Sequence, residues 1–359
     1  MSVSIWWGCG GVHVRFRSSY LCIDVTSIPV QRPDAVLISH AHRDHYSPGV
    51  VSRLRCGVVC SGGTRDLLLR EVSLGIGRWV RVEDGLRVDL GGVCVEGFSA
   101  GHVLGSLQFR IELPGAVIGY TGDLCTEGSL VECGCRFLGD VDVLVVESTY
   151  GREEFVFPPR DEVYREVAGV LEREVGRGRV VVLIGQLVGK CQELTALASR
   201  VARVPVVVSR GVYGVNEVYR CWGRDLGEYH VLGSEVSREL LKSGCALVVS
   251  LGEFRTWFRY GLKRFLRLSD VPVTVLCSGW VVSSYWSYVL RSRYLIDYLF
   301  PLSSHVDFRE LLEYVECVRP RIVITTRGFT REFARVVEER LGIRAVAIED
   351  LGCGEVSVV

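Results

Sequence analysis

The chain has 359 residues with 42 basic and 42 acidic side chains, and 48% of its residues are hydrophobic. This length allows one or two domains with a large buried core, and the zero net charge excludes a protein whose whole surface attracts polyanions. No apolar run is long enough to span a membrane, and the N-terminus lacks the charged and apolar regions of a signal peptide. We therefore expect a cytoplasmic protein that makes no membrane contact.

The cysteine content and the scarcity of thermolabile residues bear on the source of the protein. The 14 cysteines are scattered without a CxxC pair, which favours buried free thiols over a structural zinc site. The chain contains one Met and one Asn, and this favours a heat-adapted source. Such a source would also permit intracellular disulfides.

The first part of the chain consists of short β-branched runs separated by glycine-rich turns, and these runs predict strands. They cover residues 12–16, 20–25, 35–40, 57–62, 80–85, 93–101, 107–113, 116–123 and 141–149. Only residues 65–72 predict a helix in this part. So many consecutive strands indicate a sandwich of stacked sheets.

From about residue 160 the pattern changes to alternating helices and strands. The predicted helices are 161–178, 190–202, 307–318 and 330–342, and the predicted strands are 180–185, 204–211, 245–252, 271–279 and 321–326, followed by the apolar runs AVAIED and EVSVV. Strands that alternate with helices are typical of a parallel sheet covered by helices. The fold class is therefore predicted to be α/β.

The segment HAHRDH directly follows the predicted strand that begins at residue 35. His40 and His42 can converge on one ion if the backbone turns there, and Asp44 and His45 then point to a neighbouring site. A loop of this kind can hold two metal ions that polarise a phosphoryl or acyl oxygen and deprotonate water. The sequence therefore predicts a metal site at the end of this strand.

Other polar residues lie at the ends of predicted strands and would complete such a site. Asp24, Asp123 and Glu147 each end an apolar run, and His102 lies between two glycines that separate two strands. Each of these residues alone would be ordinary, but strand ends of stacked sheets lie along one rim. We therefore expect the four side chains to gather around one cleft.

These motifs, in this order, resemble the metallo-β-lactamase fold hydrolases: HAHRDH, the strand ending at Asp24, GHVLGS around His102, and TGD at 121–123. ESTYG at 147–151 resembles the β-CASP nuclease branch, and SSHVD around His305 resembles the motif with which that branch returns to its first domain. GKCQEL, SGW and LSSHVDF resemble the compact ligase-associated DNA exonucleases, and the chain also resembles archaeal mRNA 3'-end processing factors.

The resemblance implies a two-domain architecture. Residues 1–157 and 301–359 would form a metallo-β-lactamase αββα sandwich, and residues 158–300 would form an inserted β-CASP α/β domain with a parallel sheet. The active site would lie in a cleft between the two domains.

The resemblance also implies roles for individual residues. His40, His42 and His102 would hold one zinc ion, Asp44 and His45 would hold a second, and Asp123 would bridge the two; manganese is a candidate substitute. His305 would be the general acid, Glu147 would orient it, and Asp24 would bond a ligand histidine. The implied catalytic residues are Asp44, Asp123, Glu147 and His305. The candidate substrate-binding residues are Lys190, Ser278, Ser303 and Arg327.

The sequence departs from the family pattern at Arg327. The family usually ends this strand with Val-His-Gly, whose histidine completes the second zinc site, but here the strand reads ITTRGF. A guanidinium group has no lone pair to offer a metal. Three outcomes are open: water replaces the histidine at the second metal, the site works with one metal while Arg327 clamps the scissile phosphate, or the protein is a weakened or inactive paralogue.

The leading functional hypothesis is a zinc-dependent, exonuclease-like nuclease that acts on DNA or RNA in repair or RNA processing. Basic residues alternate with aromatics at 259–268 and 291–294, a pattern that suits single-stranded nucleic acid. The alternative is a catalytically weakened, nucleic-acid-binding subunit of a processing or repair complex, and a homodimer is a further option. A small-molecule hydrolase is disfavoured, since a small substrate would not need the inserted domain.

Overall fold

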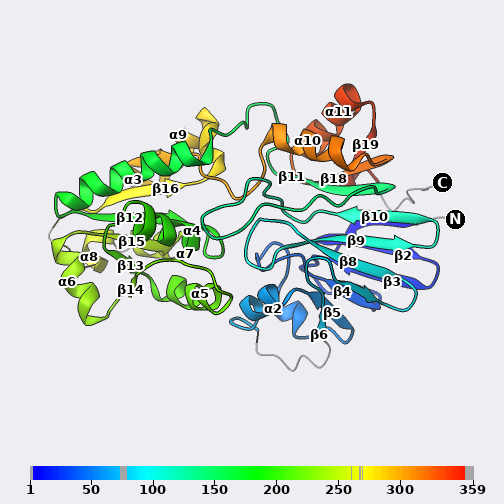
Figure 1. Ribbon diagram of the computed structural model, residues 1–359, viewed down its shortest axis with the longest axis horizontal. Coiled ribbons are helices and arrows are strands. Elements are labelled where there is room, and N and C mark those ends of the chain that lie inside the picture. The colour runs from blue at the N-terminus through cyan, green and yellow to red at the C-terminus, as the bar shows by residue number, and fades with distance from the viewer. Residues whose placement is uncertain (1–2, 73–78, 260, 267, 269, 352–359) are drawn as a thin grey trace. The chain divides into compact units, whose positions relative to one another are not determined.

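The computed structural model describes residues 3–72, 79–259, 261–266, 268 and 270–351, and it divides the chain into two units (Figure 1). The first unit contains Met1–Gly128, Cys133–Glu153 and His305–Val359. The second contains Ser129–Glu132 and Glu154–Ser304. The first unit is therefore discontinuous in sequence, and the second is inserted into it.

The first unit contains two sheets. One has six strands in the order β1-β2-β3-β4-β5-β6, antiparallel from β1 to β3 and parallel from β3 to β6. The other has seven strands in the order β19-β18-β11-β10-β9-β8-β7, with a parallel half from β19 to β10. The strands are β1 (Ser4–Gly8), β2 (Gly11–Phe16), β3 (Ser19–Ile23), β4 (Ala35–Leu37), β5 (Gly57–Cys60), β6 (Trp79–Arg81), β7 (Arg87–Asp89), β8 (Cys94–Ser99), β9 (Leu107–Leu113), β10 (Ala116–Tyr120), β11 (Val143–Ser148), β18 (Ile322–Gly328) and β19 (Arg344–Ala347).

A single apolar core lies between these two sheets. Leu21 and Leu37 from the first sheet share it with Phe109, Ile118 and Val145 from the second, and all five side chains are buried. The opposite face of the second sheet packs against α10 (Phe308–Val318) and α11 (Thr330–Leu341), while the short helices α1 (Pro48–Val51) and α2 (Gly62–Leu68) follow β4 and β5. This layering is the sandwich that the consecutive strand patterns predict.

The second unit is built on an all-parallel sheet with the order β14-β13-β15-β12-β16-β17. Its strands are β12 (Val180–Gly185), β13 (Val206–Val208), β14 (His230–Val231), β15 (Cys245–Ser250), β16 (Val273–Cys277) and β17 (Tyr298–Phe300). The central strand β12 reads VVVLIG and is buried along its whole length, as expected for a parallel strand covered on both faces.

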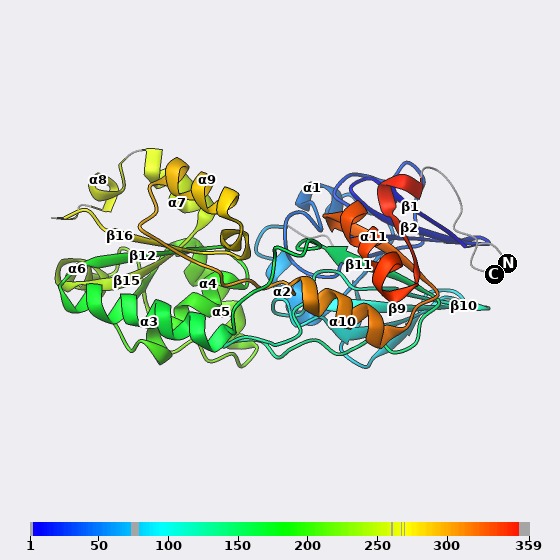
Figure 2. The same ribbon diagram turned by 90° about the horizontal axis from the view of Figure 1, so that it is seen from above.

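Helices cover both faces of this parallel sheet (Figure 2). Side chains of α3, α4 and α5 pack on one face, and side chains of α6, α7, α8 and α9 pack on the other. The helices are α3 (Arg160–Gly176), α4 (Lys190–Ala196), α5 (Arg210–Cys221), α6 (Glu235–Ser243), α7 (Leu251–Arg259), α8 (Leu262–Leu266) and α9 (Ser284–Tyr294). No helix in the described ranges is both long and apolar enough to cross a membrane.

The α/β fold class predicted from the sequence is confirmed. Some elements depart from their predicted bounds: β4 ends at Leu37 instead of residue 40, and the predicted helix 190–202 continues from α4 into a π-helical turn, η1 (Leu197–Val201). The predicted run EVSVV lies outside the described residues.

Candidate metal centre

The polar residues singled out in the first unit lie at or just beyond strand ends. His40, His42, Asp44 and His45 follow β4, Asp24 follows β3, His102 lies between β8 and β9, Asp123 follows β10, Glu147 ends β11 with Ser148, and His305 precedes α10. The helix α10 begins at a capping box in which the Asp307 carboxylate accepts hydrogen bonds from the backbone N–H groups of Arg309 and Glu310. This cap fixes the start of the helix two residues after His305.

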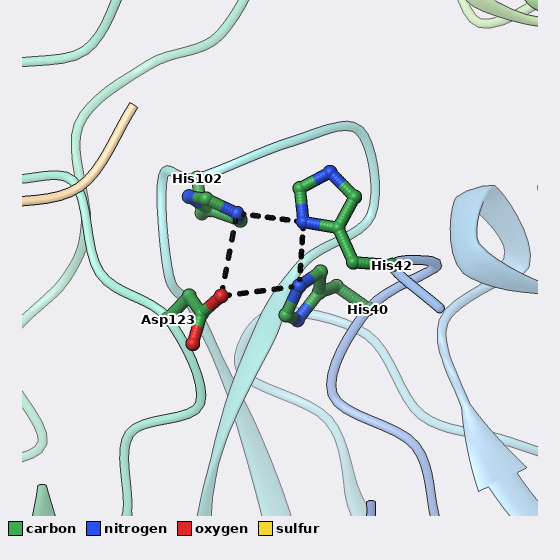
Figure 3. Close-up of side chains that lie close together, drawn as sticks. All are labelled: His40, His42, His102 and Asp123. Carbon is green, nitrogen blue, oxygen red and sulfur yellow. Dashed lines mark hydrogen bonds and ion pairs between the residues drawn. The ribbon is translucent and has the colours of Figure 1, made fainter. Parts of the chain in front are cut away.

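Four side chains converge in one buried group, His40, His42, His102 and Asp123 (Figure 3). Nδ1 of His42 lies 3.0 Å from Nε2 of His40 and 3.1 Å from Nε2 of His102. Oδ2 of Asp123 lies 3.4 Å from Nε2 of His40 and 3.6 Å from Nε2 of His102. The four donor atoms therefore face one another in the interior of the unit.

The chemistry of this group fits a metal ion. Its four donor atoms lie within 4.8 Å of one another, and Oδ1 of Asp123 has no hydrogen-bond partner among the described residues. Burial and the neighbouring His45 hold the pKa of His40 well below its usual range, which favours the neutral imidazole that binds metals. Three imidazoles and one carboxylate suit a divalent transition ion.

Asp24 is a buried hydrogen-bond acceptor close to this cluster. Its Oδ2 lies 2.7 Å from Nδ1 of His45 and accepts hydrogen bonds from the hydroxyls of Ser39 at 2.6 Å and Tyr120 at 2.7 Å. Its Oδ1 accepts from the backbone N–H of Ser39. Burial opposes the charged form, but the His45 ring outweighs it and lowers the pKa of Asp24. Asp24 was predicted from the sequence, whereas Ser39 and Tyr120 were not, and their only signal in the sequence is that each lies beside a metal-site motif.

His305 and Glu147 form a pair beside Asp123. Nδ1 of His305 lies 3.0 Å from Oε2 of Glu147, and Nε2 of His305 lies 4.0 Å from Oδ2 of Asp123. Burial lowers the pKa of His305, but Glu147 and Asp123 outweigh it and raise the pKa to about 9. The backbone N–H of Leu124 donates to Glu147 at 2.5 Å. The two carboxylates therefore favour the protonated form of the His305 ring.

Asp44 and His45 are arranged differently from the first four residues. Nε2 of His45 lies 3.2 Å from Oδ2 of Asp123 but 3.7 Å from Oδ2 of Asp44, whose side chain is 66% exposed. In the part of the chain that the structure describes, the metal-competent groups are the four-residue cluster and a second group of Asp123, Glu147 and His305. Asp44 and His45 belong to neither group.

Arg327 lies on β18 and contacts Asp44. Its Nη2 donates to the carbonyl oxygen of Asp44 at 3.1 Å, and its Nη1 lies 3.5 Å from Oδ2 of the same residue. The structure thus brings the predicted metal residues and Arg327 together within the first unit.

The remaining predicted substrate residues, Lys190, Ser278 and Ser303, belong to the second unit. Lys190 is buried, and its ammonium lies 2.5 Å from the carboxylate of Glu193. The hydroxyl of Ser278 accepts from the backbone N–H of Trp280, and the carbonyl oxygen of Ser303 accepts from Arg160. In the predicted basic segment, residues 260 and 267 lie outside the described residues, and Lys263 and Arg264 are exposed. Binding of substrate by Lys190, Ser278, Ser303 and the basic segment stays a prediction.

Residues 24–175 match the beta-lactamase superfamily domain. This match covers less than half of the chain, and together with the relatives below it confirms the resemblance to metallo-β-lactamase fold and β-CASP proteins drawn from the motifs. The fold and the buried His/Asp cluster both indicate metal binding.

Three relatives are similar to this chain over most of its length. The chain is 29% identical to a probable DNA ligase of Opitutus terrae over 87% of the chain and 28% of the ligase. It is 23% identical to the transcription termination factor FttA of Methanothermobacter thermautotrophicus over 85% of the chain and 59% of the factor. It is 24% identical to RNase aCSPSF2 of Saccharolobus solfataricus over 88% of the chain and 73% of the RNase. The chain thus spans less than two thirds of the first two proteins.

A solved structure also resembles the chain. A protein of unknown function from Enterococcus faecalis matches with a TM-score of 0.62 over 92% of this chain and 95% of that protein, at 12% sequence identity. At this identity the likeness concerns the fold alone.

Proposed function

We propose that the protein is a metal-dependent nuclease that hydrolyses phosphodiester bonds of DNA or RNA. The observation that carries the proposal is the His305–Glu147 pair beside Asp123, a member of the metal-binding cluster. Hydrolysis of a phosphodiester requires an activated water, neutralisation of charge on the phosphate, and a proton for the leaving oxygen. The cluster and the pair together offer all three.

His40, His42, His102 and Asp123 would hold the ion, for which zinc is the best fit and manganese a substitute. The ion, when bound, supplies Lewis-acid activation of water and of a phosphate oxygen. His45 would orient Asp123, since its Nε2 lies 3.2 Å from Oδ2 of that residue.

His305 would deliver the proton to the leaving oxygen. Glu147 holds Nδ1 of the ring at 3.0 Å, so the other nitrogen, Nε2, faces Asp123 and the metal cluster. Glu147 itself is fully buried, so we expect it to position the ring and stabilise its charge rather than to touch substrate. A fixed donor of this kind typically contributes about 10²- to 10⁴-fold to a rate.

Nucleic acid is the proposed substrate because the relatives include proteins named as a DNA ligase and an RNase. Within the second unit, the exposed Arg291 and Arg293 lie on α9 with the exposed rings of Tyr285 and Tyr288. Arginines combined with exposed aromatic rings suit a flexible single strand, whose bases can stack on the rings. We therefore propose single-stranded DNA or RNA as the substrate class.

The test is cleavage of single-stranded DNA and RNA of one sequence, labelled at either end, by protein stripped of metal and reloaded with Zn²⁺ or Mn²⁺. We expect cleavage of at least one substrate that depends on the added metal. Metal-loaded protein that binds the strands without cleaving either would contradict the proposal. End-specific or internal products would then distinguish exonuclease from endonuclease action.

A further inference from the structure

Arg327 is the extra residue of a β-bulge. Strands β11 and β18 pair in register as far as Glu147 and Thr326, but the next residue of β11, Ser148, pairs with Gly328. The hydroxyl of Ser148 donates to the carbonyl oxygen of Arg327 at 2.5 Å. Bulges re-aim side chains and are frequent beside active sites, and here the bulge turns Arg327 toward the metal centre.

The backbone at this bulge is unusual for the residues it contains. Arg327 has a φ of +60°, a conformation that costs a side chain other than glycine about 1–2 kcal/mol. At Gly328, where φ is +69°, a Cβ would lie 2.4 Å from the carbonyl oxygen of Ser148. The left-handed backbone at Arg327 and the close packing at Gly328 therefore fix the position of Arg327 within the bulge.

The guanidinium of Arg327 is held on two sides. It is bonded to Asp44 as described above, and its central carbon lies 5.9 Å from the centre of the Trp7 ring. The side chain is 15% exposed, and its Nε has no hydrogen-bond partner among the described residues. A guanidinium group has five N–H donors, and the bonds to Asp44 use one on each of Nη1 and Nη2, so further donors on these two nitrogens remain for a bound anion.

Asp44 already has a positive partner in Arg327. A guanidinium group cannot be a metal ligand and cannot lose its charge in a protein. A divalent ion at Asp44 and His45 would have to displace this contact and would be repelled by the remaining charge.

We propose that the centre takes a single metal ion, at His40, His42, His102 and Asp123, and that Arg327 replaces the second ion as a fixed cation. Asp44 then orients the guanidinium instead of binding metal. Because the guanidinium can bind two phosphate oxygens in a fixed geometry, Arg327 would hold the phosphate group. This last role rests on the proposed nuclease function, whereas the count of metal ions does not.

The test is the number of zinc ions per chain, measured by elemental analysis and by calorimetric titration of chelator-stripped protein with Zn²⁺. We expect about one ion for wild type and about two for Arg327→His, which offers a lone pair at the same position. The matched control is Arg335→His, on the exposed face of α11, which should still bind about one.

Asp44→Asn provides a test that does not depend on the folding of the Arg327 variant, because the Asp44 side chain is largely exposed. If Asp44 only orients Arg327, this variant binds about one ion with an affinity within about threefold of wild type. Two ions in wild type, loss of one ion in Asp44→Asn, or one ion in a folded Arg327→His variant would each overturn the single-metal proposal.

The outcome is separable from that of the cleavage assay. Wild type that binds one ion but cleaves neither DNA nor RNA would refute the nuclease and support the single-metal centre. Wild type that cleaves with two bound ions would support the nuclease and refute the role of Arg327.

Discussion

Oδ2 of Asp24 lies 2.7 Å from Nδ1 of His45, and both side chains are fully buried. Because Asp24 occupies Nδ1, the opposite ring nitrogen of His45 is directed to Asp123 at 3.2 Å. Outer partners of this kind fix the orientation of the residues that surround a metal. Asp24 is thus connected to the metal cluster through one imidazole ring.

Replacing Asp24 by Asn is expected to destabilise the first unit even without metal. The amide can no longer balance the buried His45 ring, and loss of one partner of a buried pair typically costs about 3–5 kcal/mol. Tyr120→Phe removes only one hydrogen bond to Asp24 and should cost about 1 kcal/mol. Urea unfolding of the metal-free proteins measures both changes; equal stability of Asp24→Asn and wild type would contradict this reading.

Replacing His42 by Ala is expected to abolish stoichiometric metal binding. Changes to outer partners alone typically weaken metal affinity about 10- to 100-fold, and loss of a direct ligand should weaken it more. His13 is the control, since its ring is held by the hydroxyl of Tyr20 at 2.6 Å and the carbonyl oxygen of Gly8 at 2.7 Å. His13→Gln should lower the unfolding temperature but keep the metal. Retention of metal by His42→Ala would remove this residue from the site.

Replacing His305 by Ala is expected to slow cleavage by about 10²- to 10⁴-fold while the metal content stays unchanged. The ring donates a proton in our mechanism and is not among the four metal-cluster residues. Single-turnover rates check the loss of cleavage, and elemental analysis of the same preparations checks the metal content. His230→Ala, an exposed position on β14, should leave both unchanged. An unaltered cleavage rate in His305→Ala would eliminate the general-acid role.

In the second unit, Glu193 should make stability depend on pH. Its buried carboxylate lies 2.5 Å from Lys190 and 2.6 Å from Arg160. Burial opposes its charge, but Lys190 and Arg160 outweigh burial and lower its pKa below the ordinary value of 4.5. A lowered folded pKa contributes stability that is fully present above the unfolded pKa and is lost as pH falls through the folded one.

Hydrogen exchange of the α4 amides, measured at pH 7 and in steps below pH 4.5, tests this dependence. We expect protection in wild type to fall as the pH decreases, and Glu193→Gln to be less protected at pH 7 and to change less on acidification. Glu162→Gln, on the exposed face of α3, is the control and should follow wild type. If protection of the α4 amides depended on pH in the same way in Glu193→Gln and wild type, the contacts of Glu193 with Lys190 and Arg160 would contribute nothing to stability.

Much of the fold follows from local patterns. The β9 run LQFRIEL alternates along its length, and the β12 run VVVLIG is continuously apolar, so both strands were predictable from periodicity. Helix α5 carries a mixed signal. It reads RGVYGVNEVYRC, and its two glycines and three valines locally disfavour a helix. Its buried residues Val212, Val215 and Tyr219 nevertheless recur at helical spacing and lie on one face.

The site was predictable where residues follow strands in fixed order, as His40, His42, His102 and Asp123 do. Arg327 was also identified from the sequence, as the residue that stands where a zinc-binding histidine is expected, but the orientation of its side chain was not predictable. A bulge adds one residue to β18 at this point. This bulge is held by a hydrogen bond from Ser148, which lies far from Arg327 in the sequence. No local sequence pattern therefore predicts the bulge.

The first unit is interrupted in sequence by the second, and this affects how its second sheet forms during synthesis. Strand β11 is flanked in the sheet by β10 and by β18, and all of the second unit except Ser129–Glu132 is encoded between β11 and β18. On the ribosome, the second unit can therefore close while β11 still exposes an unpaired edge, because domains fold as units as they emerge. An open strand edge is a site for mispairing. Val143–Ser148 therefore remains exposed to mispairing in the nascent chain until residues beyond Ile322 have been translated.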